Sequence, residues 1–376
     1  METQEHRSRV ANTVRWVVKI GSALATKQGL GLNNDAIADW ARQIVAIKNT
    51  GREIVIVTSG AVAEGAARLG WQTRPKSVNQ LQAAAAVGQM GLVRVWELAF
   101  QEHGCLTAQI LLTHEDIANR ERYLNSRGTL LTLMQYGVIP VINENDTVAT
   151  DEIKLGDNDT LAGLVSNLIE ADLMVILTDQ DGLMNANPRL DPTAKLIEFA
   201  TTDDPNLDAI AGEGGEWGRG GMRTKISAAR LAARSGTSTV IANGSTPDIL
   251  CTLAAGGTRG TFLAAPGAKL AARKQWMAGT LRARGRLSLD EGACLVLIQR
   301  GRSLLAVGVN AVEGDFARGE LVSCIDPQGR EIARGLVNYS AAEVALIKGL
   351  PTSRLASVLG FEHEPELIHR DNLVVL

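Results

Sequence analysis

Five apolar runs in the first two thirds of the chain are typical of β-strands, and each ends in a loop of small or polar residues. Their β-branched residues follow one another with few polar breaks, which indicates strands buried on both faces. The runs are RWVVKIGSA at residues 15–23, REIVIVTSGA at 52–61, GVIPVINEND at 137–146, DLMVILTDQDG at 172–182 and STVIANGS at 238–245.

Helical patterns lie between these runs, most clearly at residues 33–51. Residues 33–35 are suited to cap the start of this helix, and Gly51 suits its end. The apolar face would consist of Ile37, Trp40, Ala41, Ile44 and Ile47. Alternating strands and helices imply right-handed crossovers and therefore an α/β fold with a mostly parallel sheet.

A parallel sheet brings the ends of distant strands to one edge. In open α/β sheets, ligands bind beyond the carboxyl ends of the strands. We therefore expect five loops to converge on one crevice: residues 19–22, 58–60, 143–146, 178–182 and 243–245.

The pattern changes after residue 263. The segment AAPGAKLAARKQ, residues 264–275, is small, basic and without period, which predicts a linker between a first domain at 10–263 and a second at 276–376. The second domain is predicted to be small and largely β, with Gly-punctuated runs CLVLIQR, SLLAVGV, ELVSCID and EIARGLV.

Composition agrees with a globular protein of two domains. The 376 residues are 45% hydrophobic and 21% charged, and the net charge of −3 argues against a basic nucleic-acid scaffold. The four cysteines have no zinc-site spacing and fit a reducing compartment. The N-terminal segment lacks the apolar core of a signal peptide, and no apolar run reaches membrane-spanning length, so we expect a cytoplasmic protein.

Two strand ends in the expected crevice favour an anion. Lys19 ends an apolar strand before Gly21, where an ammonium could meet a phosphate; alternatively it is an edge lysine that reaches water. Ser59 and Gly60 precede a helix, whose free N–H groups hold phosphate or carboxylate. Simple capping of that helix by Ser59 is the alternative.

Acids and amides gather in two clusters, N-E-N-D at residues 143–146 and G-D-N-D at residues 156–159. Helix capping explains one or two of these acids, but not both clusters. The Gly-rich stretch RGGMRTK, residues 219–225, leads Lys225 into a helix and predicts a mobile anion-binding lid, or else an ordinary loop. Thr178 and Asp179 after the fourth run suit a nucleotide or merely a turn.

Lysines, a helix start and carboxylates at one edge suit phosphoryl transfer, in which catalysis is mostly positioning and charge compensation. The sequence has no P-loop, nucleophile elbow, H-E-x-x-H or kinase H-R-D motif, and none of its five His lies in the expected crevice loops. A carboxylate acceptor would need no general base, which agrees with that shortage of His.

Six motifs in order carry a family resemblance: K-I-G-S, V-T-S-G-A, V-I-N-E-N-D, G-D-N-D, L-T-D-x-x-G-L and G-G-M-x-T-K. Together they resemble the glutamate 5-kinases of the amino acid kinase superfamily, over residues 14–262, and the tail resembles a PUA domain. The resemblance implies a three-layer α/β sandwich with a mostly parallel central sheet, plus a small mainly-β PUA domain. It implies transfer of the ATP γ-phosphate to the γ-carboxylate of L-glutamate, the first step of proline synthesis.

The resemblance also implies roles for individual residues. Catalytic positions are Lys19, Lys225, Asp157 and Asp159. The two acids organise the lysines, and a water molecule would connect Asp157 or Asp159 to the Mg²⁺ that comes with ATP. Substrate-binding positions are Ser59, Asn143, Asp146 and Asn158. ATP-binding positions are Lys19, Thr178, Asp179, Arg219, Gly220, Gly221, Met222, Arg223, Thr224 and Lys225.

Partners follow from the same resemblance: ATP with Mg²⁺, proline as a feedback inhibitor, a homo-oligomer (dimer or tetramer), and a glutamyl phosphate reductase that takes up the product. Arg219 and Arg223 depart from the family pattern. The alternatives are a kinase of this fold acting on another acidic amino acid, and an RNA-binding or RNA-modifying protein. The second is disfavoured because residues 276–376 hold 11 Lys and Arg against 12 Asp and Glu.

Overall fold

The computed structural model of the protein describes residues 10–27, 29–73, 75, 77–149, 158–186, 191, 193–211, 221–266, 283–360 and 364–376. By its internal contacts the chain divides into two units, residues 1–115 with 127–269 and residues 116–126 with 270–376. The domain bounds 10–263, 264–275 and 276–376 stay a prediction, since residues 267–275 of the expected linker lie outside the described residues.

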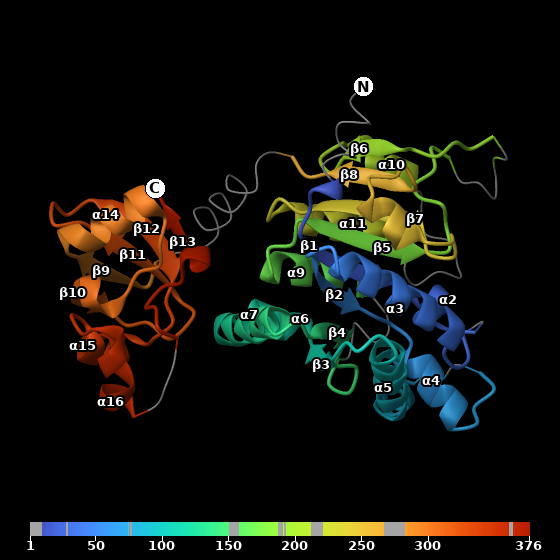
Figure 1. Cartoon of the computed structure of the whole chain (residues 1–376), viewed down its shortest axis with the longest axis horizontal. Coiled ribbons are helices and arrows are strands. Elements are labelled where there is room, and N and C mark those ends of the chain that lie inside the picture. The colour runs from blue at the N-terminus through green and yellow to red at the C-terminus, as the bar shows by residue number, and fades with distance from the viewer. Residues whose placement is uncertain are drawn as a thin grey trace. The chain divides into compact units, whose positions relative to one another are not determined.

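The first unit is built on an eight-stranded sheet (Figure 1) with the strand order β3-β4-β2-β1-β5-β7-β8-β6. The first six strands in that order pair in parallel, and β8 then pairs antiparallel with β7. The predicted mostly parallel sheet is confirmed. The strands are β1 (Arg15–Ile20), β2 (Glu53–Val57), β3 (Thr107–Leu112), β4 (Ile139–Glu144), β5 (Leu173–Thr178), β6 (Phe199–Thr201), β7 (Ser238–Asn243) and β8 (Thr261–Ala264).

Helices connect these strands. No helix within the described residues is long and apolar enough to cross a membrane. The helices between β1 and β8 are α2 (Ser22–Ala25), α3 (Asn34–Lys48), α4 (Ala61–Arg68), α5 (Val78–Gln101), α6 (His114–Ala118), α7 (Arg120–Gln135), α9 (Asn158–Leu168), α10 (Asn206–Ala211), α11 (Met222–Ala233) and α12 (Ile249–Ala254).

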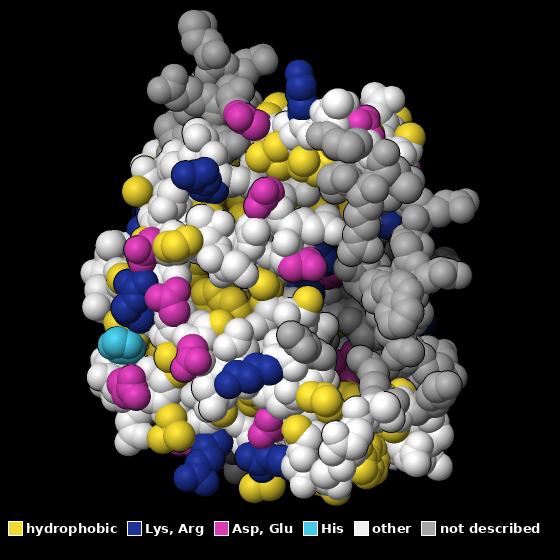
Figure 2. Space-filling view, turned by 90° about the vertical axis from the view of Figure 1, so that its right-hand side faces the viewer, with side chains coloured by type: hydrophobic (Ala, Val, Ile, Leu, Met, Phe, Trp, Pro, Cys, Tyr) yellow, Lys and Arg dark blue, Asp and Glu magenta, His cyan; other side chains and the backbone are white. Residues whose placement is uncertain are grey.

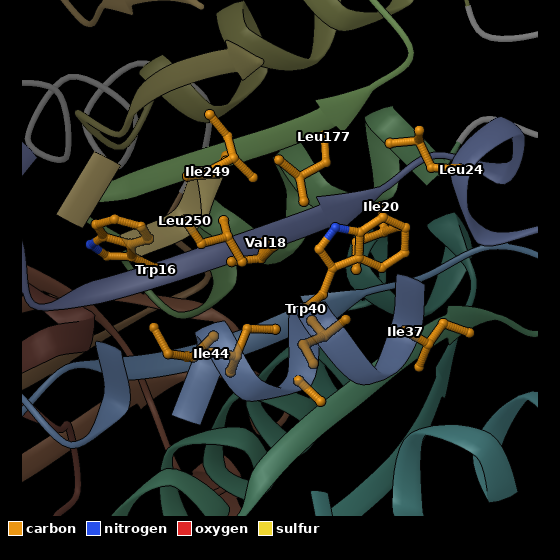
Figure 3. Packing of buried hydrophobic residues seen from close by; sticks show 14 of the residues in the cluster. Trp16, Val18, Ile20, Leu24, Ile37, Trp40, Ile44, Leu177, Ile249 and Leu250 are labelled. Atoms are coloured by element: carbon orange, nitrogen blue, oxygen red, sulfur yellow. The ribbon is translucent and has the colours of Figure 1, made fainter. Parts of the chain in front are cut away.

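The two faces of the sheet are separated by the period-two alternation of side chains along each strand. On β1, Trp16, Val18 and Ile20 are buried in one cluster with apolar residues of α3, α5 and α12. Figure 3 shows Trp40 and Ile44 of α3 beneath this row. The helices α9 and α11 pack on each other and contact β1, β5 and β7, and Lys19 of β1 pairs with α9. Helices on both faces give the predicted three layers.

The helix α3 follows its sequence signals closely. It spans Asn34–Lys48, the Asn33 side chain accepts a hydrogen bond from the N–H of Ala36, and all five predicted apolar residues are buried. Gly51 has a φ of 92°, a left-handed conformation that favours glycine. Caps and apolar period therefore agreed, which is why this helix was predictable.

Glycines let α4 and α5 touch backbone to backbone. A Cβ on Gly65 would lie 1.7 Å from the carbonyl O of Ala84, and a Cβ on Gly88 would lie 1.8 Å from that of Ala61. No side chain fits at either position. The crossing therefore fixes α5 beside the start of α4, where the V-T-S-G-A loop ends.

The second unit contains a five-stranded sheet of order β10-β9-β11-β12-β13, in which β9 and β11 are parallel and the other pairs antiparallel. Its strands are β9 (Gly285–Leu289), β10 (Val309–Gly314), β11 (Leu321–Ile325), β12 (Glu331–Leu336) and β13 (Leu373–Val375). Its helices are α14 (Glu291–Arg300), α15 (Ala341–Ile347) and α16 (Leu355–Leu359), with 3₁₀ turns η1 (Ala306–Gly308), η2 (Thr352–Arg354) and η3 (Arg370–Asn372).

Two predicted strands of this unit are wrong. The run CLVLIQR lies inside the helix α14, because the Asp290 side chain caps its start, Gly301 ends it in a left-handed conformation, and Cys294 and Leu297 bury one side. In SLLAVGV, a 3₁₀ turn at Ala306–Gly308 precedes β10, which begins only at Val309. An apolar run of this length fits a helix as well as a strand. In CLVLIQR, the capping residues Asp290 and Gly301 favour the helix.

Candidate active site

The carboxyl ends of five parallel strands lie side by side, in the order β4-β2-β1-β5-β7. The five loops predicted to converge follow these strands and therefore share one edge of the sheet. Figure 1 draws the arrowheads of β5 and β7 toward this edge, and Figure 2 views the molecule from that side. In its coloured part, Lys and Arg are interspersed with Asp and Glu. Lys19 and Lys225 are buried.

Asp159, in the first turn of α9, brings two lysines together. Its Oδ1 lies 2.5 Å from Nζ of Lys19, and its Oδ2 lies 3.1 Å from Nζ of Lys225 in α11. The Thr224 hydroxyl donates to the same Oδ2 at 2.8 Å. Each of the three charged side chains is at most 7% exposed.

This environment shifts both kinds of group. Burial raises the pKa of the Asp159 carboxyl, but the charges of Lys19 and Lys225 outweigh burial and hold that pKa well below its usual range. Burial lowers the pKa of the Lys225 ammonium, Asp159 opposes this, and Lys19 adds to it. Asp159 is therefore ionised at neutral pH and fixes two ammonium groups at the tip of β1.

Asn158, the neighbour of Asp159, connects the ends of two strands, β2 and β4, to α9. Its Nδ2 lies within hydrogen-bonding distance of the Thr58 carbonyl O (2.6 Å), the Ser59 hydroxyl (2.9 Å) and Oδ1 of Asn143 (3.0 Å). Asn143, at the end of β4, in turn donates from Nδ2 to Oε1 of Gln89 at 2.7 Å. The result is a network of polar side chains beside Asp159 and its two lysines.

A third group of polar residues follows β5 and β7. The Thr178 hydroxyl donates to Oδ1 of Asp179 at 3.1 Å, and Nδ2 of Asn243 donates to Oδ1 of Asp181 at 3.0 Å. Asp179 also raises the pKa of the Lys225 ammonium, behind the larger effects of burial and Asp159. Asp179 therefore lies within electrostatic reach of Lys225.

The amino acid kinase family model matches residues 14–243, and the PUA domain model matches residues 285–359. The chain belongs to the amino acid kinase family. It is 60% identical to a glutamate 5-kinase of Stutzerimonas stutzeri (strain A1501) over 371 residues, which cover 98% of this chain and all of that protein. Over the same shares it is 58% identical to glutamate 5-kinases of Pseudomonas putida (strain GB-1) and Burkholderia mallei (strain SAVP1).

Most residues assigned from the resemblance to the amino acid kinase family lie at the crevice edge. Two sets of contacts meet at the chain neighbours Asn158 and Asp159: Lys19, Thr224 and Lys225 contact Asp159, and Ser59 and Asn143 contact Asn158. Asp146 is half-buried in the turn directly after β4, and Gly221 and Met222 begin α11. Asp157, Arg219 and Gly220 lie outside the described residues.

Arg223 differs from its neighbours in this kinase motif. It is exposed, and it acts on Asp208, whose pKa is lowered mainly by Arg230 with a smaller contribution from Arg223. Its exposed guanidinium contrasts with the buried ammonium of Lys225, two residues later.

The structure decides between the structural alternatives for three residues. Gly60, not Ser59, occupies the N-cap position of α4, with no side-chain cap. Asp159 directs its carboxylate to the two lysines. Lys19 is 5% exposed and does not reach water as an edge lysine would. Their functional roles in an amino acid kinase remain predictions.

Several polar residues at this edge escaped the sequence analysis. Gln82, Gln89 and Trp96 of α5 form hydrogen bonds with residues that follow or end β2 and β4, but the sequence pattern gave no sign of a role for this helix. His114, just after β3, places Nδ1 3.4 Å from Oε1 of the buried Glu144. The sequence did not predict β3 as a strand, so no functional residue was expected at its carboxyl end.

Proposed function

We propose that this protein transfers the γ-phosphate of ATP to the γ-carboxylate of L-glutamate, giving L-glutamyl 5-phosphate and ADP, the first step of proline biosynthesis. Membership of the amino acid kinase family and the glutamate 5-kinase relatives along the whole chain support this function. The structural observation that carries it is the buried arrangement of Lys19 and Lys225 on either oxygen of Asp159.

The reaction needs charge compensation more than proton transfer. A carboxylate oxygen of glutamate forms a bond to the γ-phosphorus while the bond from that phosphorus to the β–γ bridging oxygen breaks, and ADP leaves. No proton has to move, because the attacking carboxylate is already ionised. Lys19 and Lys225 neutralise the phosphate oxygens, and Asp159 holds both ammonium groups in place before the nucleotide arrives.

The amide network on the other side suits the amino acid. Asn158, Asn143 and Ser59 present polar atoms at the crevice edge, and the turn after β4 carries Asp146. A carboxylate such as Asp146 is suited to the α-ammonium group of glutamate. This arrangement would set the γ-carboxylate towards the lysine pair.

The nucleotide would lie over the ends of β5 and β7. Thr178 and Asp179 suit its sugar or base, and residues 219–225 suit its phosphates. No group of three acidic, His or Cys side chains that could hold a metal occurs within the described residues. Mg²⁺ bound with the ATP phosphates would offset part of their charge, and Asp159, or Asp157 outside those residues, would hold it through water.

The remaining parts of the proposal rest on the family resemblance: inhibition by proline, a homo-oligomer, delivery of the product to a glutamyl phosphate reductase, and a cytoplasmic location. All four cysteines are free, which supports a reducing compartment.

The test is ADP release with glutamate, aspartate and N-acetylglutamate in turn, with and without Mg²⁺, in hydroxylamine to trap an acyl phosphate as its hydroxamate. Glutamate should give hydroxamate equal to ADP, and only with Mg²⁺. If aspartate or N-acetylglutamate were the preferred substrate, the protein would be an amino acid kinase of another specificity, and the proposal of glutamate as substrate would be wrong. ADP release without hydroxamate would contradict carboxyl phosphorylation. Repeating the assay with proline tests inhibition.

A further inference from the structure

Three side chains of α5, two amides and the indole N–H of a buried Trp, form hydrogen bonds with residues that end or follow β2 and β4. Gln82, Gln89 and Trp96 are spaced by seven residues, which is two helical turns, so they lie in a row along the helix. We call this row the α5 polar face. Its members stand among alanines, glycines and apolar residues that pack the rest of the helix.

Each member of the α5 polar face makes a hydrogen bond with a residue that ends or follows β2 or β4. Nε2 of Gln82 donates to the carbonyl O of Ala149 at 3.0 Å, in the turn that follows β4. Oε1 of Gln89 accepts from Nδ2 of Asn143 at 2.7 Å. Nε1 of Trp96 donates to the Thr58 hydroxyl at 3.2 Å.

The Gln89 contact sets the orientation of the Asn143 amide. Because Nδ2 of Asn143 donates to Gln89, its Oδ1 faces Asn158 and accepts from that residue at 3.0 Å. Asn158 also contacts the Thr58 carbonyl O and the Ser59 hydroxyl. A hydrogen-bonded chain therefore runs from α5 through Asn143 to the residues proposed to bind glutamate.

The helix is rigidly placed for this task. Gly88, next to Gln89, packs so closely on Ala61 that an added Cβ would lie 1.8 Å from its carbonyl O. α5 therefore keeps a fixed height relative to the V-T-S-G-A loop and cannot slide without separating from α4.

We propose that the α5 polar face is a positioning element for the amino-acid half of the site. Gln89 orients Asn143, Gln82 holds the turn that carries Asp146, and Trp96 holds Thr58. The inference rests on the proposed function and adds to it three residues that act through the substrate-binding groups rather than on substrate.

The test compares Gln89→Met with Gln101→Met, the same substitution at the exposed end of the same helix. Loss of one hydrogen bond should raise the KM for glutamate about three- to tenfold and leave the KM for ATP within about twofold. Gln101→Met should leave both unchanged. Gln82→Met, a second variant on the same face, should also raise the glutamate KM selectively.

A double-mutant cycle separates positioning from general support. In an Asn143→Ala background, Gln89→Met should change the glutamate KM by less than about twofold, because the residue it acts through is gone. A full effect in that background, equal changes in both KM values, or no difference between Gln89→Met and Gln101→Met would overturn the inference. Wild-type enzyme that makes no glutamyl hydroxamate would instead overturn the proposed function.

Discussion

The two faces of the strand β1 serve different purposes. Trp16, Val18 and Ile20 point into the apolar cluster with α3, whereas Lys19, one residue out of that register, pairs with Asp159 of α9. A period of two thus allows one strand to supply both core and site. The comparison teaches that a substitution on the core face should cost stability without loss of chemistry, whereas one on the site face should cost both.

The largest combined effect is expected for Asp159→Asn. It leaves Lys19 and Lys225 buried without their shared carboxylate, so the free energy of unfolding should fall by about 3–5 kcal/mol, and kcat should fall at least about 100-fold. Urea unfolding measures the free energy of unfolding, and the hydroxamate assay measures kcat. Asp208→Asn, at an exposed ion pair with Arg230, is the control and should change little. Wild-type behaviour of Asp159→Asn would contradict the account.

Ile44→Ala tests the opposite face. Ile44 of α3 is fully buried in the apolar cluster that includes Trp16, Val18 and Ile20, so its truncation should lower the free energy of unfolding by about 3 kcal/mol. The kcat of the folded enzyme should stay within about twofold of wild type, as no contact links Ile44 to the lysine pair. A large loss of kcat in fully folded protein would show that the faces are not separable.

Asp146→Ala sharpens the division within the site itself. Loss of a charged partner should raise the KM for glutamate about tenfold or more. The KM for ATP should change far less, because Asp146 follows β4 while the nucleotide residues follow β5. Steady-state kinetics in both substrates provide the measurement, and equal effects on the two KM values would remove Asp146 from the amino-acid half.

The smallest effect is a pH dependence of the Asp159 contribution. The pKa of Asp159 is lowered in the folded state, so the ionised carboxylate stabilises the fold above the unfolded pKa of about 3.9. That contribution is lost as the pH falls through the folded pKa. The difference in unfolding free energy between wild type and Asp159→Asn should be constant from about pH 7 to pH 5 and shrink below about pH 4. A difference that grows on acidification has the wrong sign.

Local signals made much of the first unit predictable. The capping residues and apolar period of α3 predicted its bounds. The alternation of strands with helices predicted a parallel sheet, and Lys19, Ser59 and Asn143 lie at its carboxyl edge. The ion pairs of the site were not predictable in the same way. That Asp159 lies between Lys19 and Lys225 depends on how α9 and α11 pack, which no short segment encodes.

Two features show why the rest was missed. Gln82, Gln89 and Trp96 look unremarkable within α5, and their partners Ala149, Asn143 and Thr58 are distant in sequence. The run CLVLIQR was misassigned because its apolar content was weighed above Asp290 and Gly301, the cap residues that make it α14. Capping residues deserve the greater weight in short apolar runs.

The most direct test of the central claim is the kcat of Lys225→Ala in the hydroxamate assay, with ATP binding measured by calorimetry on the same protein. If Lys225 stabilises the transferring phosphoryl group, kcat should fall at least about 100-fold while the protein still binds ATP. Near-normal kcat would contradict the account.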